Sequence, residues 1–147
     1  MTSYLLDTNI VSETSKPAPD ANCIAWLKSK RGQCRLSSVT VAELRYGIER
    51  MPEGKRKAGA ESEFQFLCDD FTGLLEFDGP AAYEWGRYAA ELEAEHGADW
   101  WKHFDMRDTL VAAIAREYGL TVATRNGKHF PFCQTENPFS FSEHAPG

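Results

Sequence analysis

The chain contains 147 residues, of which 42% are hydrophobic and 26% are charged, so its length and composition suit one globular domain with its own core. It lacks an apolar run long enough to span a bilayer and a basic signal-peptide start, so we expect a cytoplasmic protein with no membrane partner. The net charge of −6 leaves two interpretations: no polyanionic partner, or acids gathered at a metal site with basic residues grouped elsewhere.

The first half of the chain alternates short apolar runs with amphipathic segments. In chain order we expect a strand at 4–7, helices at 9–15 and 21–31, a strand at 34–37, and helices at 38–51 and 55–71. Asp20 can cap the helix at 21–31. The helix at 55–71 offers Phe64, Phe66 and Leu67 for packing.

The second half continues the same alternation. We expect a strand at 74–77, a helix at 79–95, an irregular aromatic segment at 96–104, a helix at 105–118 and a strand at 120–124. The helix at 105–118 would direct Met106, Leu110, Ala113 and Ile114 to one side. The pattern predicts a single α/β domain over 1–147, with a largely parallel sheet and its core at about 3–130. The tail at 131–147 is expected to be irregular, with one edge strand near 133–135.

The four cysteines predict neither a disulfide nor a zinc site. Cys23, Cys34, Cys68 and Cys133 are widely spaced and do not combine with the histidines at a zinc-binding spacing. We therefore expect reduced cysteines, with those in apolar surroundings acting as small core residues.

Three acidic residues stand where strands and helices meet. Asp7 ends the first strand, Glu43 follows the second strand, and Asp108 precedes a highly apolar helical segment. Structural roles remain open for each. Asp7 can be a helix N-cap and Asp108 a cap or first-turn acid, whereas Glu43 can pair with Thr40 in a capping box. Asp105 lies on the same helix face as Asp108 and can point at a site in its place.

The carboxyl ends of parallel strands meet at one edge of a sheet, so these acids are expected to converge. Two carboxylates about 4 Å apart repel by roughly 4 kcal/mol at an effective dielectric constant near 20, so such a group takes up protons or binds a cation. Because no cysteine or histidine accompanies them, the hard cations Mg²⁺ and Mn²⁺ are favoured. A metal held by carboxylates suits phosphodiester hydrolysis, with Glu43 orienting or deprotonating the attacking water.

Four segments resemble, in order and spacing, the PIN-domain ribonucleases, and most closely the toxins of VapC type and their FitB-like relatives. These segments are Leu5–Asn9, Val39–Ile48, Asp108–Ala115 and Val122–Asn126. The resemblance covers residues 3 to about 130. It implies a PIN-like three-layer sandwich with helices on both sides of the sheet.

The resemblance also implies a function. It implies an endoribonuclease that needs Mg²⁺ or Mn²⁺ and acts on tRNA or other RNA. It further implies a homodimer that is held inactive by a cognate antitoxin, whose tail enters the active groove. Asp7, Glu43 and Asp108 match the acidic triad of the family, with Asp7 and Asp108 as metal ligands.

Asn126 departs from the family pattern, because FitB-like members have an aspartate there and other members have an acid where this chain has Lys128 and His129. Asn126 can hold a metal-bound water without adding charge, which puts a second metal in doubt. It can equally be a turn residue, of the type that tolerates positive φ, beside Gly127. Arg45, Arg125 and Lys128 are candidates for contacts with RNA phosphates, or else lie on solvated faces.

Two other functional classes remain open from the sequence. A receiver-type or dehalogenase-like phosphotransfer domain also gathers acids at strand ends, although the second aspartate of the dehalogenase motif is missing after Asp7. A degenerate PIN domain that binds RNA or a partner without cutting is the other alternative, and the departures at Asn126 and His129 are its main support.

Overall fold

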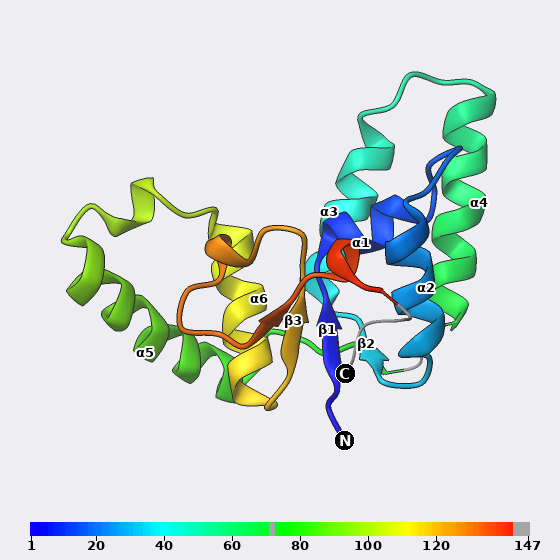
Figure 1. Ribbon diagram of the computed structural model, residues 1–147. Helices are drawn as coiled ribbons and strands as arrows, with labels where there is room; N and C mark the ends of the chain where they lie inside the picture. The colour runs from blue at the N-terminus through cyan, green and yellow to red at the C-terminus, as the bar shows by residue number, and fades with distance from the viewer. Residues whose placement is uncertain (71–72, 143–147) are drawn as a thin grey trace.

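A four-stranded parallel sheet forms the centre of the fold (Figure 1). The structure is a computed structural model and describes residues 1–70 and 73–142. Its strands are β1 (Tyr4–Leu6), β2 (Cys34–Arg35), β3 (Thr121–Ala123) and β4 (Thr135–Glu136), arranged in the order β2-β1-β3-β4. Every pairing is parallel, which confirms the predicted sheet and places β1, the first strand of the chain, between two others.

The register of β1 and β3 determines which residues meet beyond the sheet. Leu6 lies opposite Ala123, so the next residues, Asp7 and Thr124, emerge side by side at the carboxyl edge. The strands are shorter than predicted. The expected strand at 74–77 is reduced to one parallel bridge between Leu75 and Ser37, which extends the sheet beside β2.

Helices fill the connections between these strands. They are α1 (Thr8–Glu13), α2 (Ala21–Ser29), α3 (Ser38–Glu49), α4 (Lys55–Asp70), α5 (Gly79–His96) and α6 (Met106–Glu117). Three short 3₁₀ turns follow the same order: η1 (Trp100–Lys102), η2 (Gly127–His129) and η3 (Pro138–Ser140). The bounds agree with the predicted helices to within two residues, although the expected end of α4 at residue 71 lies outside the described residues. None of the described helices is long and apolar enough to cross a bilayer.

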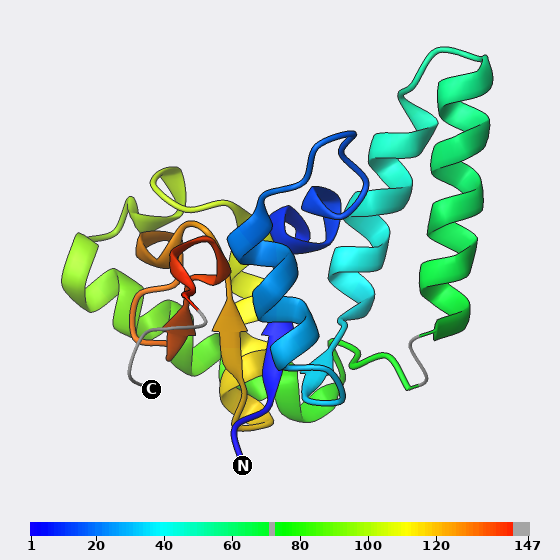
Figure 2. The same ribbon diagram turned by 45° about the vertical axis from the view of Figure 1, so that its right-hand side comes forward.

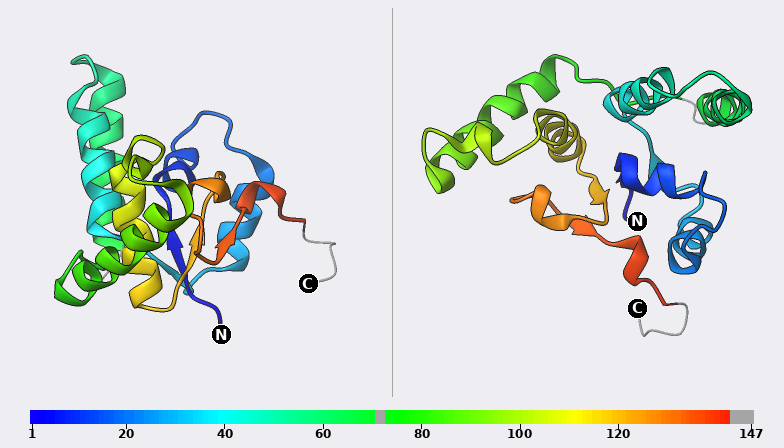
Figure 3. Two further views of the ribbon diagram at one scale, coloured as in Figure 1. Left: turned by 90° about the vertical axis from the view of Figure 1, so that its left-hand side faces the viewer. Right: turned by 90° about the horizontal axis from the view of Figure 1, so that it is seen from above.

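The two faces of the sheet are covered by different helices, which gives three layers (Figure 3). Leu5 and Val122 point to one face and pack against α5 and α6. Tyr4 and Leu6 point to the other face and pack against α1 and α2, where Trp26 is fully buried. This alternation follows from the two-residue period of a strand whose faces are both covered. All four cysteines are free, as predicted.

The C-terminal segment is more ordered than expected. The edge strand falls at Thr135–Glu136 rather than at 133–135. The carboxylate of Glu136 accepts a hydrogen bond from Trp26 Nε1 on α2. Phe139 and Phe141 pack against the same core cluster as Trp26, so this part of the tail belongs to the fold.

The α3–α4 hairpin extends past the carboxyl edge of the sheet (Figures 1 and 2). Phe66 on α4 was expected to pack inward, but it is 75% exposed. Met106 was grouped with the apolar side of α6, but it is 50% exposed because the buried residues of this helix begin later, at Thr109. Both errors arise because an amphipathic pattern does not show where along its length a helix is covered.

Candidate active site

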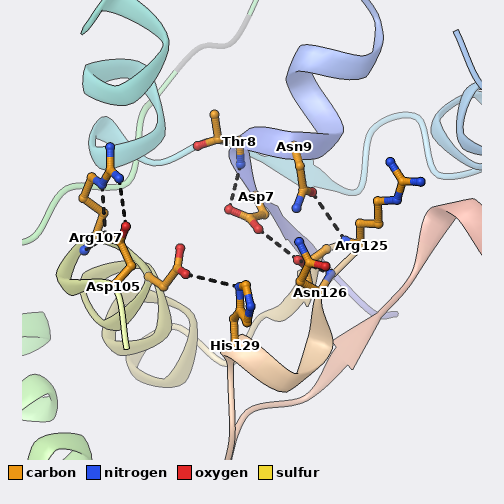
Figure 4. A network of polar contacts seen from close by, with 10 residues as sticks. Asp7, Thr8, Asn9, Asp105, Arg107, Arg125, Asn126 and His129 are labelled. Atoms are coloured by element: carbon orange, nitrogen blue, oxygen red, sulfur yellow. Dashed lines mark hydrogen bonds and ion pairs between the residues drawn. The ribbon is translucent and has the colours of Figure 1, made fainter. Parts of the chain in front are cut away.

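Asp7 lies at the carboxyl end of β1 and is only 7% exposed. Its backbone N–H donates to Ala123 O at 2.9 Å, which continues the sheet by one residue. One carboxylate oxygen accepts from Thr8 N at 2.8 Å and the other accepts from Thr124 Oγ1 at 2.9 Å (Figure 4). Asp7 is therefore the N-cap of α1, as its structural interpretation required, and it also faces the cavity described below.

Glu43 lies in the second turn of α3, and its capping-box interpretation is wrong. The N-cap of α3 is Ser37, whose Oγ accepts from Thr40 N at 3.1 Å, so Glu43 does not fold back to a cap. Glu43 Oε1 and Thr8 Oγ1 are both buried, and although the two side chains are close enough to interact, neither atom makes a hydrogen bond of ordinary geometry within the described part of the chain. An unpaired buried acceptor is rare in a native protein and commonly marks a site for an ion or a water.

Asp105 and Asp108 have different roles: Asp105 caps α6, and Asp108 faces the cavity. Asp105 is the N-cap of α6 and accepts from Arg107 N at 2.8 Å, while its other oxygen lies 2.8 Å from the Arg107 guanidinium. Asp108 lies in the first turn, and its Oδ2 is 3.7 Å from Nδ1 of His129. Asp108, and not Asp105, lines the cavity.

These side chains surround one open cavity of about 410 Å³ at the carboxyl edge of the sheet. It is lined by Asp7, Thr8, Asn9, Ser12, Glu13, Lys16, Glu43, Asp108, Arg125, Asn126 and His129. We call it the acidic pocket. The expected convergence of acids from β1, α3 and α6 is thus observed, although those residues are far apart in the sequence.

Three acids of the pocket, Asp7, Glu43 and Asp108, hold protons more tightly than ordinary carboxyl groups. Burial raises the pKa of Asp108 to about 7, helped by the negative charges of Asp7, Asp105 and Glu43. Burial also raises the pKa of Asp7, against the opposing effect of its hydrogen bonds. The pKa of Glu43 is raised by burial too, despite the nearby Arg107. The pocket is therefore short of positive charge.

Asn126 and His129 come from the turn after β3. Asn126 is a turn residue, as its structural interpretation held, since its carbonyl oxygen accepts from His129 N at 2.9 Å, but its φ of −121° makes no use of the positive-φ region. Its backbone N–H donates to Thr124 Oγ1 at 3.0 Å, and Thr124 in turn donates to Asp7. Sequence reasoning missed Thr124 and His129 as site residues. The alignment of two strand ends would have indicated Thr124, because it follows β3 as Asp7 follows β1.

A second cavity adjoins the acidic pocket. It has a volume of about 730 Å³, lies between α1, α3 and α4, and is mainly apolar, with Leu44, Ile48 and Phe66 among its lining residues. We call it the apolar groove. Thr8, Ser12 and Glu43 line both cavities, so one elongated occupant can reach from the groove to the carboxylates.

Comparison with protein families decides what this arrangement is. The family model of the PIN domain matches residues 4–135, which include every acid of the pocket. The chain belongs to the PIN-domain family. This PIN domain gathers Asp7, Glu43 and Asp108 in one pocket, as the sequence resemblance implied, and the assignment favours a nuclease over the phosphotransfer alternative.

The relatives of this PIN domain include bacterial toxins and ribonucleases. It is 36% identical over 129 residues to Toxin FitB of Neisseria gonorrhoeae, covering 86% of this chain and 89% of that protein. It is 32% identical to the tRNA(fMet)-specific endonuclease VapC of Shigella flexneri, covering 88% and 91% of the two chains. The crystal structure of FitAcB from Neisseria gonorrhoeae superposes with a TM-score of 0.81 at 33% identity, covering 94% and 99%.

The predicted basic residues of the PIN domain occupy different environments. Arg125 lines the acidic pocket, whereas Arg45 and Lys128 do not. The guanidinium of Arg45 forms ion pairs with Glu49 and Glu61 on the α3–α4 hairpin. Lys128 is exposed on η2.

The donors of the pocket fit a hard divalent cation that keeps part of its hydration shell. Asp7 and Asp108 supply carboxylate oxygens, and the buried Oε1 of Glu43 lacks a partner among the described residues. No three acidic, histidine or cysteine side chains in residues 1–70 and 73–142 lie close enough to enclose an ion by themselves. This arrangement suits Mg²⁺, which usually binds one or two carboxylates and several waters.

Proposed function

We propose that this protein is the ribonuclease toxin of a toxin–antitoxin pair, and that it cuts RNA phosphodiesters in the cytoplasm with the help of Mg²⁺ or Mn²⁺. One observation carries the proposal: Asp7, Glu43 and Asp108 come from distant parts of the chain, share one pocket, and each have a raised pKa. Membership of the PIN-domain family, with relatives that are toxins and ribonucleases, supports the same conclusion.

The carboxylates of the pocket have distinct roles in this proposal. Asp7 and Asp108 would hold the divalent ion, which when bound supplies positive charge to the phosphodiester and lowers the pKa of a bound water. Thr124 fixes the orientation of Asp7 through its 2.9 Å hydrogen bond. Glu43 is the candidate proton acceptor, because its raised pKa lies closer to neutral pH than that of an ordinary glutamate. Its Oε1 also makes no hydrogen bond in the described structure. Asn126 can orient a water but adds no charge.

Replacement of Asp7 tests the catalytic proposal. Asp7→Asn preserves the shape of the side chain but removes one negative charge, so metal-dependent cleavage of RNA should be lost, as it should be in excess EDTA. Asp99→Asn is the matched control, because Asp99 is exposed and lies outside the pocket. This replacement should leave cleavage unchanged. Undiminished cleavage in excess EDTA would falsify the proposal.

We propose tRNA as the preferred substrate. Support comes from the name of the Shigella flexneri relative, a tRNA(fMet)-specific endonuclease, and from the open mouth of the acidic pocket, which a folded RNA can approach. Incubation of the protein and Mg²⁺ with total bacterial RNA should yield discrete tRNA fragments. Fragments derived from messenger or ribosomal RNA alone would contradict this choice of substrate.

We propose that an amphipathic segment of an antitoxin occupies the apolar groove. The groove is large enough for several apolar side chains, and it runs to Glu43 at the acidic pocket, so a basic residue of the same segment can neutralise the carboxylates. We also propose a homodimer, for which the exposed aromatic side chains of Tyr83 and Trp101 offer candidate contacts. Light scattering of the toxin alone tests the dimer, since a monomeric mass would exclude it.

The second candidate function is a PIN domain that binds RNA or a partner without cutting. Asn126 favours it, because the pocket has one carboxylate fewer than FitB-like members. Gel-shift and cleavage assays on the same RNA distinguish the two functions. A binding module retains RNA and gives no metal-dependent products, whereas the nuclease gives products that require the metal.

A further inference from the structure

Two basic side chains, Lys16 and Arg125, line the acidic pocket beside its carboxylates. Lys16 follows α1, and Arg125 follows Thr124 at the end of β3. Cations at this place weaken the attraction of the pocket for a metal ion, so metal binding does not explain them. Lys16 also neutralises the buried Glu13, but two cations at the rim of the pocket additionally offer a site for an anionic ligand.

Arg125 is held in a position that leaves its hydrogen-bond donors available. Its backbone N–H donates to Asn9 Oδ1 at 3.4 Å, and its guanidinium carbon lies 4.6 Å from the centre of the Phe139 ring. Stacking on a ring uses the face of the guanidinium and leaves the N–H edge free. In Figure 4 the side chain extends away from the Asp7 carboxylate, so the Arg125 guanidinium lies at the side of the pocket and not among its carboxylates.

Phe139 is itself fixed by the C-terminal segment. Its backbone N–H donates to Asn137 Oδ1 at 2.9 Å, and its carbonyl oxygen accepts from Asn22 Nδ2 on α2 at 3.1 Å. The ring packs against the core cluster that contains Trp26. The platform beneath Arg125 is therefore part of the folded core rather than a loose loop.

Lys16 is placed by a buried carboxylate. Glu13 is only 4% exposed, and its two oxygens lie 2.9 Å from Lys16 Nζ and 3.2 Å from Asp20 N. The Lys16 side chain is 55% exposed, and its ammonium group has three donors, so one contact with Glu13 leaves two for a ligand. Lys16 lowers the pKa of the Glu13 carboxyl and the charge of Arg125 adds a smaller effect, so both cations lie within electrostatic reach of this acid.

We propose that Lys16 and Arg125 form a second phosphate site, which binds the RNA phosphate next to the scissile one. This inference rests on the proposed ribonuclease function. The carboxylates and their metal take the scissile phosphodiester, and the two cations take its neighbour on the same strand. Glu13 and Phe139 are positioning residues for this site, since they act on the RNA only through Lys16 and Arg125.

Salt dependence of RNA binding tests the site. In the Asp7→Asn background, where the RNA should not be cut, the affinity for a fluorescent single-stranded oligoribonucleotide of mixed sequence is measured by anisotropy at several salt concentrations. Lys16→Ala and Arg125→Ala should each lower the slope of log K against log salt by about 0.7, the value for one lost contact on a single strand. Arg125→Lys keeps the charge and should retain most of the slope.

Two controls make the result specific. Lys28→Ala removes an equally exposed cation on α2 that does not line the pocket, and its slope should match the parent. Phe139→Leu keeps an apolar side chain but removes the ring, so it should weaken RNA binding less than Arg125→Ala and have no further effect in an Arg125→Ala protein. This non-additivity would not follow from a purely structural role.

The outcomes separate this inference from the function on which it rests. If the wild-type protein cuts RNA but Lys16→Ala and Arg125→Ala leave the slope unchanged, only the second phosphate site is refuted. If these variants instead lose antitoxin affinity while the RNA slope is retained, the cations bind a carboxylate of the partner and the site is again refuted. If the wild-type protein neither binds nor cuts RNA, the proposed function itself fails.

Discussion

Replacement of Asp108 by asparagine should stabilise the metal-free protein. Asp108 carries an ordinary carboxyl pKa of 3.8 when unperturbed, and burial together with its acidic neighbours raises this pKa to about 7. The native state therefore binds more protons than the unfolded chain between these two pH values. Stability must fall as the pH rises through this window, and the full penalty is present above about pH 7.

The size of the effect follows from the same pKa. A gap of about three pH units at about 1.4 kcal/mol per unit gives an upper bound of about 4 kcal/mol. The pocket is open to solvent, which screens the charges, so we expect a gain of about 2 kcal/mol for Asp108→Asn at pH 8. Loss of a first-turn acid from α6 opposes this gain, but only by about 0.5 kcal/mol, so the net change remains stabilising.

Urea denaturation in EDTA, from pH 5 to pH 8, measures this difference. The wild-type protein should gain stability as the pH falls, whereas Asp108→Asn should vary less and approach the wild-type value near pH 5. Saturating Mg²⁺ should reduce or reverse the advantage of the variant, because a cation that binds only the native wild-type protein stabilises it. Asp99→Asn, at an exposed site, controls for the loss of one negative charge. A destabilised Asp108→Asn protein at pH 8 in EDTA would refute this account of the pocket.

Three further changes test separate parts of the site. Thr124→Val leaves a buried Asp7 oxygen without its donor and should lower the free energy of unfolding by about 1–3 kcal/mol, whereas Thr124→Ser should not. Equal denaturation midpoints for the two variants would contradict the role of the hydroxyl. Asn126→Asp adds a charge beside the metal ligands and should tighten Mn²⁺ binding by about tenfold, or about 1.4 kcal/mol, in calorimetry; an unchanged or weaker affinity counts against it. Phe66→Ser alters a side chain that is 75% exposed and lines the apolar groove. It should change the unfolding free energy by less than about 0.5 kcal/mol but weaken antitoxin binding, and an unaltered antitoxin affinity would show that Phe66 lies outside that interface.

The sequence predicted the parts of the fold that depend on periodicity and strand order. Asp7, Glu43 and Asp108 could be placed at one edge because each follows a strand or opens a helix, and parallel strands share a carboxyl edge. The resemblance assigned Asp108 to the acidic triad, while the residue pattern left Asp105 open as an alternative. Asp105 is occupied by Arg107, two residues along the chain, and Asp108 faces the pocket.

The remaining features depend on contacts that local sequence does not show. Ser37, rather than Thr40, caps α3. The strand β2 ends at Arg35 and not at the predicted residue 37, so Ser37 is free to precede the first helical residue, Ser38. His129 was seen only as a departure from an acidic motif, although its ring reaches Asp108. Glu13 and Lys16 resembled ordinary surface residues of a short helix, and only the packing around α1 reveals that Glu13 is buried.

The central position of β1 has a consequence for when the toxin can become active during its own synthesis. The first strand to leave the ribosome needs β3 as its neighbour, and β3 begins at Thr121. Asp7 therefore lacks its hydrogen bond from Thr124 until Thr124, 117 residues later, has also been translated. A nascent chain cannot assemble the carboxylate centre before that point, so the cell makes no active product during the synthesis of the residues between these two.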